Sequence, residues 1–207
     1  MKKLLYIMLV FAFSSTSLYS QGFSEARVKQ EINNAAAKLM SLQCDFVQTK
    51  YLKMLNDKMI SNGKMYYLQS NKLRWEYTSP YHYTFILNDN KVLLKNDNRN
   101  DVIDVQQNKL FKEIARIMMN SVVGKSLSDE RDFKSKISSS GSEWIATLTP
   151  VRKEMKQMFK EIYLYFNKTS YMVSKVTLIE KNGDKTVIEL KNVKTNGTIN
   201  AAIFKIN

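Results

Sequence analysis

The sequence predicts a mainly β protein with a few helices, built as an antiparallel barrel or sandwich. Two observations support this class. Short runs in which apolar and polar residues alternate recur along most of the chain, and tight polar turns separate them. A helical pattern over residues 109–123 divides these runs into two groups, and no parallel-sheet motif flanks it. We expect about ten or eleven strands in all.

The N-terminus has the pattern of a secretory signal peptide, residues 1–20. Lys2 and Lys3 precede an apolar run from Leu4 to Phe13, and small polar residues follow. The apolar run is shorter than the roughly 20 residues that cross a membrane. We therefore expect cleavage after Ser20, which leaves residues 21–207 as a single domain.

A helix is expected at the start of the mature chain. Ser24 can cap it, and Glu25 lies in its first turn. Its apolar residues recur at helical spacing and predict one stripe that packs on a sheet: Val28, Ile32, Ala35, Ala36 and Leu39. A strand over Leu42–Leu55 follows. It contains Cys44, the one cysteine of the chain, which alternates with apolar residues and is expected to pack as one of them.

Short strands and turns make up the rest of the first half. Turns are predicted at Asn62–Gly63, Ser70–Lys72 and Asn88–Asn90, and Ser79–Pro80 ends a strand. The strands between these points are Met65–Leu68, Leu73–Tyr77, Tyr81–Leu87 and Lys91–Lys95. The segment Asp97–Asp101 resembles a calcium loop, but Val102 replaces the required glycine, so an exposed hairpin loop is expected instead.

The helical pattern that follows has one apolar face. The residues on this face are Leu110, Phe111, Ile114, Ile117, Met118 and Val122. Ala115 and Met119 widen it. Gly124 is expected to end the helix. We expect this helix to cover the mouth of a barrel or to fill its interior.

Strands resume in the second half of the chain. Pro150 ends one of them, and Asn182–Gly183 predicts a hairpin. The expected strands are Phe133–Ile137, Trp144–Leu148, Lys153–Phe166 as one long strand or a hairpin, Val173–Glu180, Thr186–Lys191 and a short last strand, Ala202–Ile206.

The composition lacks the groups that common catalytic and metal sites require. The chain has one histidine, His82, and six glycines, and its carboxylates are scattered. We therefore predict no metal site, no cofactor, no catalytic residues and no enzyme activity. The net charge of +13 suits anionic lipid or an acidic partner, or serves solubility alone. Nucleic acid is not expected as a partner, since no basic helix or known binding signature is present.

The most informative segment is Leu73-Arg74-Trp75-Glu76-Tyr77. In a strand its leucine, tryptophan and tyrosine lie on one face, and its arginine and glutamate lie on the other as a surface pair. A large aromatic face without a catalytic set indicates a container for an apolar ligand. The predicted lining is Phe46, Leu73, Trp75, Tyr77, Tyr83 and Phe85.

The whole mature chain resembles the periplasmic outer-membrane lipoprotein carrier family, LolA. The matching pieces occur in the family's order. They are the N-terminal helix, Cys44–Gln48, Gly63, the signature run with Arg74 and Pro80, Asp89–Val92, the helix at Leu110–Met119, Leu148–Pro150 and Asn196–Phe204.

This resemblance implies an incomplete antiparallel barrel covered by the N-terminal helix and a lid helix. It implies a monomer in the periplasm of a Gram-negative bacterium that takes lipoproteins from an inner-membrane ABC transporter, holds their acyl chains and passes them to an outer-membrane acceptor. The family often has Arg-Pro before the signature run, where the arginine latches the lid. Here Gln69 and Ser70 stand at those positions, so a weaker latch is expected.

Two other functions remain open from the sequence. One is a binding or sensing module of the same fold for another lipid or lipid-like product, because one fold supports several functions. The other is a secreted hydrolase, which has the least support because no catalytic motif is present.

Overall fold

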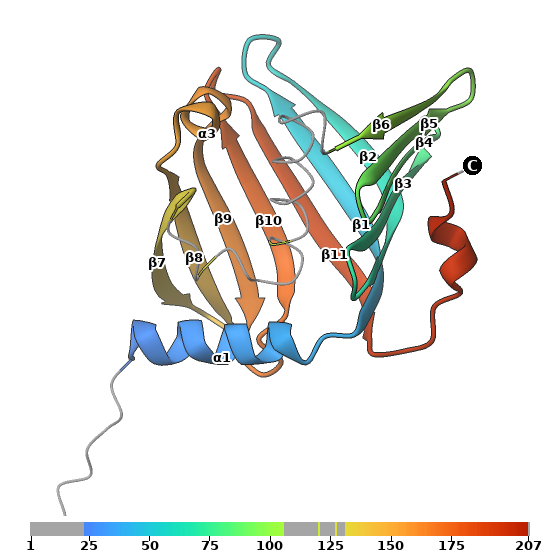
Figure 1. Ribbon diagram of the computed structural model, residues 1–207. Coiled ribbons are helices and arrows are strands. Elements are labelled where there is room, and N and C mark those ends of the chain that lie inside the picture. The colour runs from blue at the N-terminus through green and yellow to red at the C-terminus, as the bar shows by residue number, and fades with distance from the viewer. Residues whose placement is uncertain (1–22, 106–119, 121–126, 128–130, 207) are drawn as a thin grey trace, which may run out of the picture.

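The protein folds into an open antiparallel sheet of eleven strands that curves into a half-barrel (Figure 1). The computed structural model describes residues 23–105, 120, 127 and 131–206. The strand order is β6-β5-β4-β3-β2-β1-β11-β10-β9-β8-β7, so β1 pairs with both β2 and β11 and joins the two halves of the chain. The predicted incomplete barrel is confirmed.

The helices and strands have the following bounds: α1 (Glu25–Ala37), β1 (Ser41–Leu52), β2 (Asp57–Leu68), β3 (Lys72–Ser79), β4 (Tyr83–Asn88), β5 (Lys91–Asn96), β6 (Asn100–Asp104), β7 (Phe133–Ser140), β8 (Glu143–Pro150), α3 (Lys153–Met158), β9 (Phe159–Asn167), β10 (Val173–Glu180), β11 (Lys185–Thr195) and the 3-10 helix η2 (Ala201–Phe204). No helix in the part of the chain that the structure describes is long and apolar enough to cross a membrane.

Helix α1 lies across one end of the half-barrel (Figure 1). Ser24 caps it as predicted, since its hydroxyl oxygen accepts a hydrogen bond from the Arg27 N–H at 3.4 Å. Val28 and Ile32 pack with apolar side chains of β7–β10, whereas Ala36 packs with those of β1–β5. The apolar stripe therefore spans both halves of the sheet and closes this end of the core.

The concave face of the sheet carries two apolar clusters. The first gathers side chains from β1–β5 and the second gathers side chains from β7–β10. Leu190 of β11 packs against both. Because β11 lies at the middle of the sheet, it makes one continuous apolar surface out of two clusters.

The convex face of β3–β5 is covered by the C-terminal segment. Phe204 of η2 is fully buried there against Ile86 and Leu93. The Arg74 Nη1 group donates to the Ile203 carbonyl oxygen at 3.1 Å, and the Asn88 side-chain amide donates to the Phe204 carbonyl oxygen at 3.1 Å. These contacts hold η2 on the sheet.

Two predicted strands are helical in the structure. Lys153–Met158 forms α3, and only Phe159–Asn167 of the predicted long segment is a strand. Strong helix formers and one buried residue, Met155, favour a single helical turn after Pro150. The predicted last strand is η2, because the Asn200 side-chain oxygen accepts from the Ala202 N–H at 2.9 Å and caps a 3-10 turn.

The prediction of a turn at Asn62–Gly63 is wrong. Both residues lie inside β2, paired with Val47 and Phe46 of β1. An Asn-Gly pair usually marks a turn, but here the glycine makes room for a neighbouring ring. The expected hairpin loop at Asp97–Asp101 is shorter than predicted, because Asn100–Asp104 forms the unpredicted edge strand β6.

The other turn predictions are confirmed. Asp89 adopts a left-handed conformation in the two-residue turn between β4 and β5. Ser70 and Asn71 do so between β2 and β3, and Gly183 does so between β10 and β11. Ser79–Pro80 ends β3 as expected.

Candidate functional site

The predicted lining residues meet on the concave face. Strand pairing places Trp75 of β3 opposite Phe85 of β4, and Tyr77 opposite Tyr83. Residues directly opposite in antiparallel strands project to the same face of a sheet. The six side chains therefore form one aromatic surface from residues that are distant in the sequence.

A glycine lets the aromatic side chains of β1 and β3 touch across the intervening strand. Phe46 of β1 lies directly opposite Gly63 of β2. A Cβ atom at position 63 would overlap the Phe46 ring and the carbonyl oxygen of Glu76. Because that atom is absent, the Phe46 ring crosses β2 and lies 4.4 Å from the Trp75 ring, centroid to centroid. It also meets the Tyr77 ring edge-on at 5.2 Å.

Exposure of this surface increases along β3, away from α1. Leu73 and Phe46 are fully buried, whereas Trp75 and Phe85 expose 7% and 8% of their surface. Tyr77 and Tyr83 are half-buried, and their ring centroids are 6.3 Å apart. Tyr81 is 46% exposed, and its ring centroid lies 6.2 Å from that of Tyr77. The aromatic surface thus runs from a closed base to an accessible end.

The polar groups of this surface are neutral. The Tyr77 hydroxyl donates to the Gln48 side-chain oxygen at 3.0 Å and so joins two segments that match the LolA pattern. Burial raises the pKa of Tyr77 and of Tyr83, so both phenols stay protonated at neutral pH. An uncharged, mostly apolar surface suits a hydrocarbon ligand.

Sequence reasoning missed the second half of the concave face. The second cluster contributes Leu148, Ile162, Leu164 and Phe166, which are almost completely buried. Their alternation was visible in the sequence. The face of the sheet on which they lie was not, because it depends on the pairing of β8, β9 and β10. Met65 and Tyr67 of β2 were missed as lining residues for the same reason.

The family-signature residues lie outside the aromatic surface. Arg74 projects to the convex face, where its Nε group is 3.0 Å from a Glu76 carboxylate oxygen, as the predicted surface pair requires. Its bond to Ile203 gives it the further role of anchoring η2. Pro80 is exposed just after β3.

The predicted latch position, Gln69, is exposed in the turn after β2. Its backbone N–H donates to the Met40 carbonyl oxygen at 2.7 Å. The predicted lid residues lie outside the described residues: Leu110, Phe111, Ile114, Ile117, Met118 and Met119.

Two further features bear on chemistry: the buried thiol of Cys44 and the arrangement of metal-ligating side chains. Burial raises the pKa of the Cys44 thiol to about 12, so it remains protonated. A reactive cysteine has a lowered pKa instead. Among the residues that the structure describes, no group of three or more His, Cys, Asp or Glu side chains can hold a metal ion.

Comparison with known proteins identifies a family. The model described as outer membrane lipoprotein carrier protein LolA matches residues 37–207. No curated protein matches the chain.

Solved structures share the fold. A chain of the Pseudomonas aeruginosa MucA/MucB complex has a TM-score of 0.54 and 11% identity, and the match covers 87% of this chain and 61% of that one. For MucB alone the TM-score is 0.52 at 11% identity, with 88% and 62% covered. A LolA superfamily protein from Nitrosomonas europaea has a TM-score of 0.46 at 9% identity, with 89% and 98% covered. This chain spans about three fifths of the MucB length.

Proposed function

Because this chain belongs to the family of the outer membrane lipoprotein carrier protein LolA, we propose that it is a periplasmic carrier that binds the acyl chains of lipoproteins on its concave face. The observation that carries this proposal is the continuous apolar surface of an open sheet. It comprises both clusters and Leu190 between them. Buried apolar residues on one face of a sheet form either a packed core or the wall of a ligand cavity, and membership of a lipoprotein carrier family supports the cavity here.

The energetics of an acyl chain favour such a surface. Each CH₂ group transferred out of water is worth about 0.8 kcal/mol, so an acyl chain of about sixteen carbons needs about 12 kcal/mol of compensation. Scattered contacts cannot supply that amount, whereas a surface shared by β1–β5 and β8–β10 can cover a whole chain. A purely apolar site also makes no covalent bond, so the cargo remains free to leave.

The partners follow from the proposed role. Lipoproteins would come from an inner-membrane ABC transporter and pass to an outer-membrane acceptor, with the protein acting as a monomer. The leader at residues 1–20 would direct the chain to the periplasm. The lid helix over residues 109–123 would cover the bound chains, and Met118 and Met119 would adapt to their shape.

A second candidate is a binding or sensing module for another lipid or lipid-like product. The observation that favours it is Gln69, where the family often has a lid-latching arginine. A neutral amide bonds a lid backbone more weakly than a guanidinium does, which would alter the cycle of loading and release. A module of this kind would hold its ligand without passing it on.

The test is release of lipoproteins from the inner membrane. Residues 21–207 are added to spheroplasts that hold newly made, labelled lipoproteins, and labelled protein in the soluble fraction is measured. A carrier yields a soluble one-to-one complex. Release is expected to fall in Trp75→Ala and Phe85→Ala, since both changes remove aromatic area from the lining. Met118→Asp is expected to impair release as well.

Tyr165→Ala is the matched control, because Tyr165 lies on the opposite face of the sheet beneath Lys175. It removes an aromatic side chain without changing the lining. Circular dichroism and thermal unfolding verify that each variant is folded. If folded wild type releases no lipoprotein, the carrier role is wrong and the second candidate takes its place. If folded lining variants release as much as Tyr165→Ala, the cargo lies elsewhere.

A further inference from the structure

The hairpin formed by β1 and β2 extends beyond β3 on one side. β1 and β2 pair as far as Leu52 and Asp57, but β2 pairs with β3 only as far as Asn62 and Ser79. Residues 57–61 therefore have no β3 neighbour, whereas β1 stays paired with β11 as far as Tyr51. The turn of the hairpin lies at the end opposite α1 (Figure 1).

The tip of this hairpin is apolar and exposed. Met54 exposes 91% of its surface and Leu55 exposes 71%, the two highest values among the large exposed apolar residues. The turn itself needs neither side chain, since Asn56 supplies its left-handed conformation with a φ of 49°. Polar residues would serve the turn equally well, so a methionine and a leucine in it require another explanation.

The apolar character continues down both faces of the hairpin. Met59 and Ile60 are adjacent in β2 and thus project to opposite faces, yet 45% and 48% of their surfaces are exposed. A hairpin that only extends a sheet into water alternates polar with apolar residues. Exposed apolar residues therefore occur at the tip and on both faces of the hairpin near it.

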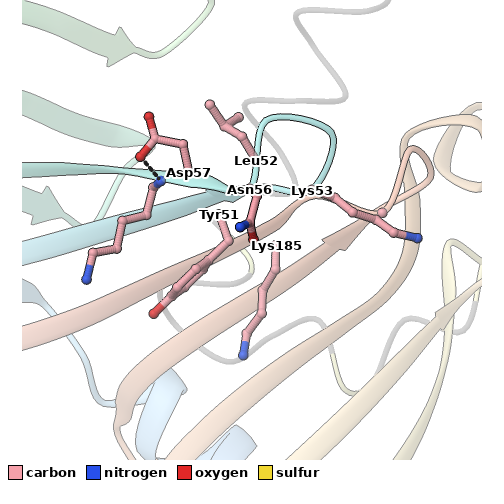
Figure 2. A pocket seen from close by; sticks show the side chains of 8 residues that line it. Tyr51, Leu52, Lys53, Asn56, Asp57 and Lys185 are labelled. Atoms are coloured by element: carbon pink, nitrogen blue, oxygen red, sulfur yellow. Dashed lines mark hydrogen bonds between the residues drawn. The ribbon is translucent and has the colours of Figure 1, made fainter.

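Lysines surround this tip. Tyr51, Lys53, Lys58 and Lys185 line a hollow of about 580 Å³ at the base of the turn (Figure 2). Lys58 and Lys185 flank Tyr51 on the neighbouring strands, and the Lys185 Nζ atom lies 5.6 Å from the centre of the Tyr51 ring. In the described part of the chain, none of these three lysines is in an ion pair.

The backbone supports this arrangement. Gly183 lies in the turn between β10 and β11, and a Cβ atom there would come within 2.6 Å of the Lys53 Cδ atom. The Lys53 side chain, including its Nζ atom, thus lies over this glycine, where a side chain would collide with it. Asp57 is the one carboxylate that lines the hollow, and it accepts a hydrogen bond from the Lys58 N–H at 2.7 Å. The local charge is therefore positive.

We propose that this hairpin tip docks the protein on an anionic lipid bilayer. Met54 and Leu55 enter the interface between headgroups and acyl chains, and Lys53, Lys58 and Lys185 pair with lipid phosphates around them. Charge complementarity favours a lipid surface over a protein groove, because ammonium groups that ring an apolar tip match phosphates above hydrocarbon. The docking goes beyond the carrier role, since it needs neither cargo nor a protein acceptor.

The test uses vesicles without protein. Residues 21–207, whose described fold begins at Phe23, are floated with vesicles of phosphatidylethanolamine and phosphatidylglycerol, and the bound fraction is measured. Binding is expected to weaken as salt rises, since the Debye length falls to about 10 Å at 0.1 M. The double change Met54→Asp with Leu55→Asp is expected to lower affinity about tenfold or more. Vesicles of phosphatidylcholine alone are expected to bind much less.

Met40→Asp is the matched control. Met40 is 55% exposed and lies just before β1, at the end opposite the hairpin tip. This variant makes one Met→Asp change beside the same strand, to be compared with Met54→Asp alone, and is expected to bind as wild type does. Leu55→Trp provides a second readout, because brominated lipids quench the added tryptophan only if the tip enters the bilayer. Wild type gives the background from Trp75 and Trp144.

Three outcomes would overturn the proposal. If the wild-type protein does not float with anionic vesicles, the hairpin tip does not dock on a bilayer. Equal loss of binding in Met40→Asp and the tip variant would indicate adsorption by net charge. Unchanged vesicle binding in the tip variant, together with lost lipoprotein transfer, would make the tip a contact for a protein. The carrier role is tested separately by release from spheroplasts, so either idea can fail alone.

Discussion

At the residue scale, Gly63 decides whether the aromatic surface can form. The Phe46 ring fills the space above it, and the Glu76 carbonyl oxygen closes the remaining side. A glycine within a strand usually weakens it, and here the loss is compensated by contacts between the rings of β1 and β3. One missing side chain thus determines the shape of the proposed lining.

Gly63→Ala is expected to lower the free energy of unfolding by about 1–3 kcal/mol, because the new methyl group forces the Phe46 ring and the β3 backbone apart. Urea unfolding measures this change in the free energy of unfolding. Gly197→Ala is the control, since no atom lies within 4 Å of a Cβ built there. Equal effects at both positions would mean that Gly63 is not packed as described.

Cys44 yields a second prediction at this scale. Burial raises the pKa of its thiol to about 12, so at pH 8 only about one molecule in ten thousand holds a thiolate. A disulfide reagent is therefore expected to leave the folded protein unlabelled and to label it rapidly in denaturant. Met54→Cys provides an exposed thiol for comparison. Rapid labelling of Cys44 in the folded state would contradict its burial.

The same shift predicts a dependence of stability on pH. The pKa of the folded-state thiol is raised above its ordinary value of 9.0, so burial favours the protonated form. Its contribution to stability is complete below about pH 9 and is lost as the pH rises toward 12. Burial raises the pKa of Tyr77 as well, which adds a loss in the same direction above pH 10. Cys44→Ala is expected to flatten the first part of this decline.

At the element scale, η2 packs on the convex face of the sheet and covers it. Its Phe204 side chain is fully buried against Ile86 of β4 and Leu93 of β5. Arg74 and Asn88 donate hydrogen bonds to the carbonyl oxygens of Ile203 and Phe204, respectively. The signature arginine therefore connects the centre of the aromatic strand to the C-terminus. The convex side of β3–β5 is packed, which leaves the concave side for a ligand.

Phe204→Ala is expected to lower the free energy of unfolding by about 3 kcal/mol, because a fully buried ring is replaced by a cavity. Phe23→Ala is the control, since Phe23 is 50% exposed and stacks on Trp144 at the surface. Thermal and urea unfolding compare the two. If Phe204→Ala lowers the free energy of unfolding less than Phe23→Ala does, η2 does not stabilise the sheet as described.

At the scale of the whole molecule, the two ends of the half-barrel differ. α1 closes one end, where its stripe packs with both clusters. The other end carries the exposed Tyr81, the hairpin tip and the lysines around it. An apolar surface that opens toward a membrane-docking end would allow an acyl chain to move from the protein to the bilayer over a short path.

Ligand binding is expected to stabilise the whole fold. A triacylated lipopeptide at about 100 times its Kd would raise the free energy of unfolding by about 2.7 kcal/mol, because it binds only the folded state. Thermal unfolding with and without the lipopeptide measures the effect. Phe85→Ala is expected to reduce the shift and Tyr165→Ala to retain it. No shift in wild type would argue against acyl-chain binding.

The sequence by itself determined what depends on near neighbours. Alternation with period two revealed most strands, and left-handed residues such as Asp89 and Gly183 marked hairpins, because both signals arise within a few residues. The resemblance to the LolA family is confirmed by the match over residues 37–207. The aromatic face from Phe46 to Phe85 was predicted from alternation, and its role in binding cargo stays a prediction. The short segments that form α3 and η2 were wrongly predicted as strands. Helix-forming residues with the buried Met155 favour α3, and the Asn200 cap with the buried Phe204 favours η2.

Only the tertiary structure decided which faces meet. The pairing of β1 with β11 joins residues about 140 positions apart, and no local pattern encodes that contact. It places Leu190 between the two clusters. The packing of η2 brings Ile203 to Arg74, and the pairing of β2 with β3 leaves the β1–β2 tip beyond β3. Alternation tells which residues share a face, but whether that face is concave, convex or free depends on strands that come from elsewhere in the chain.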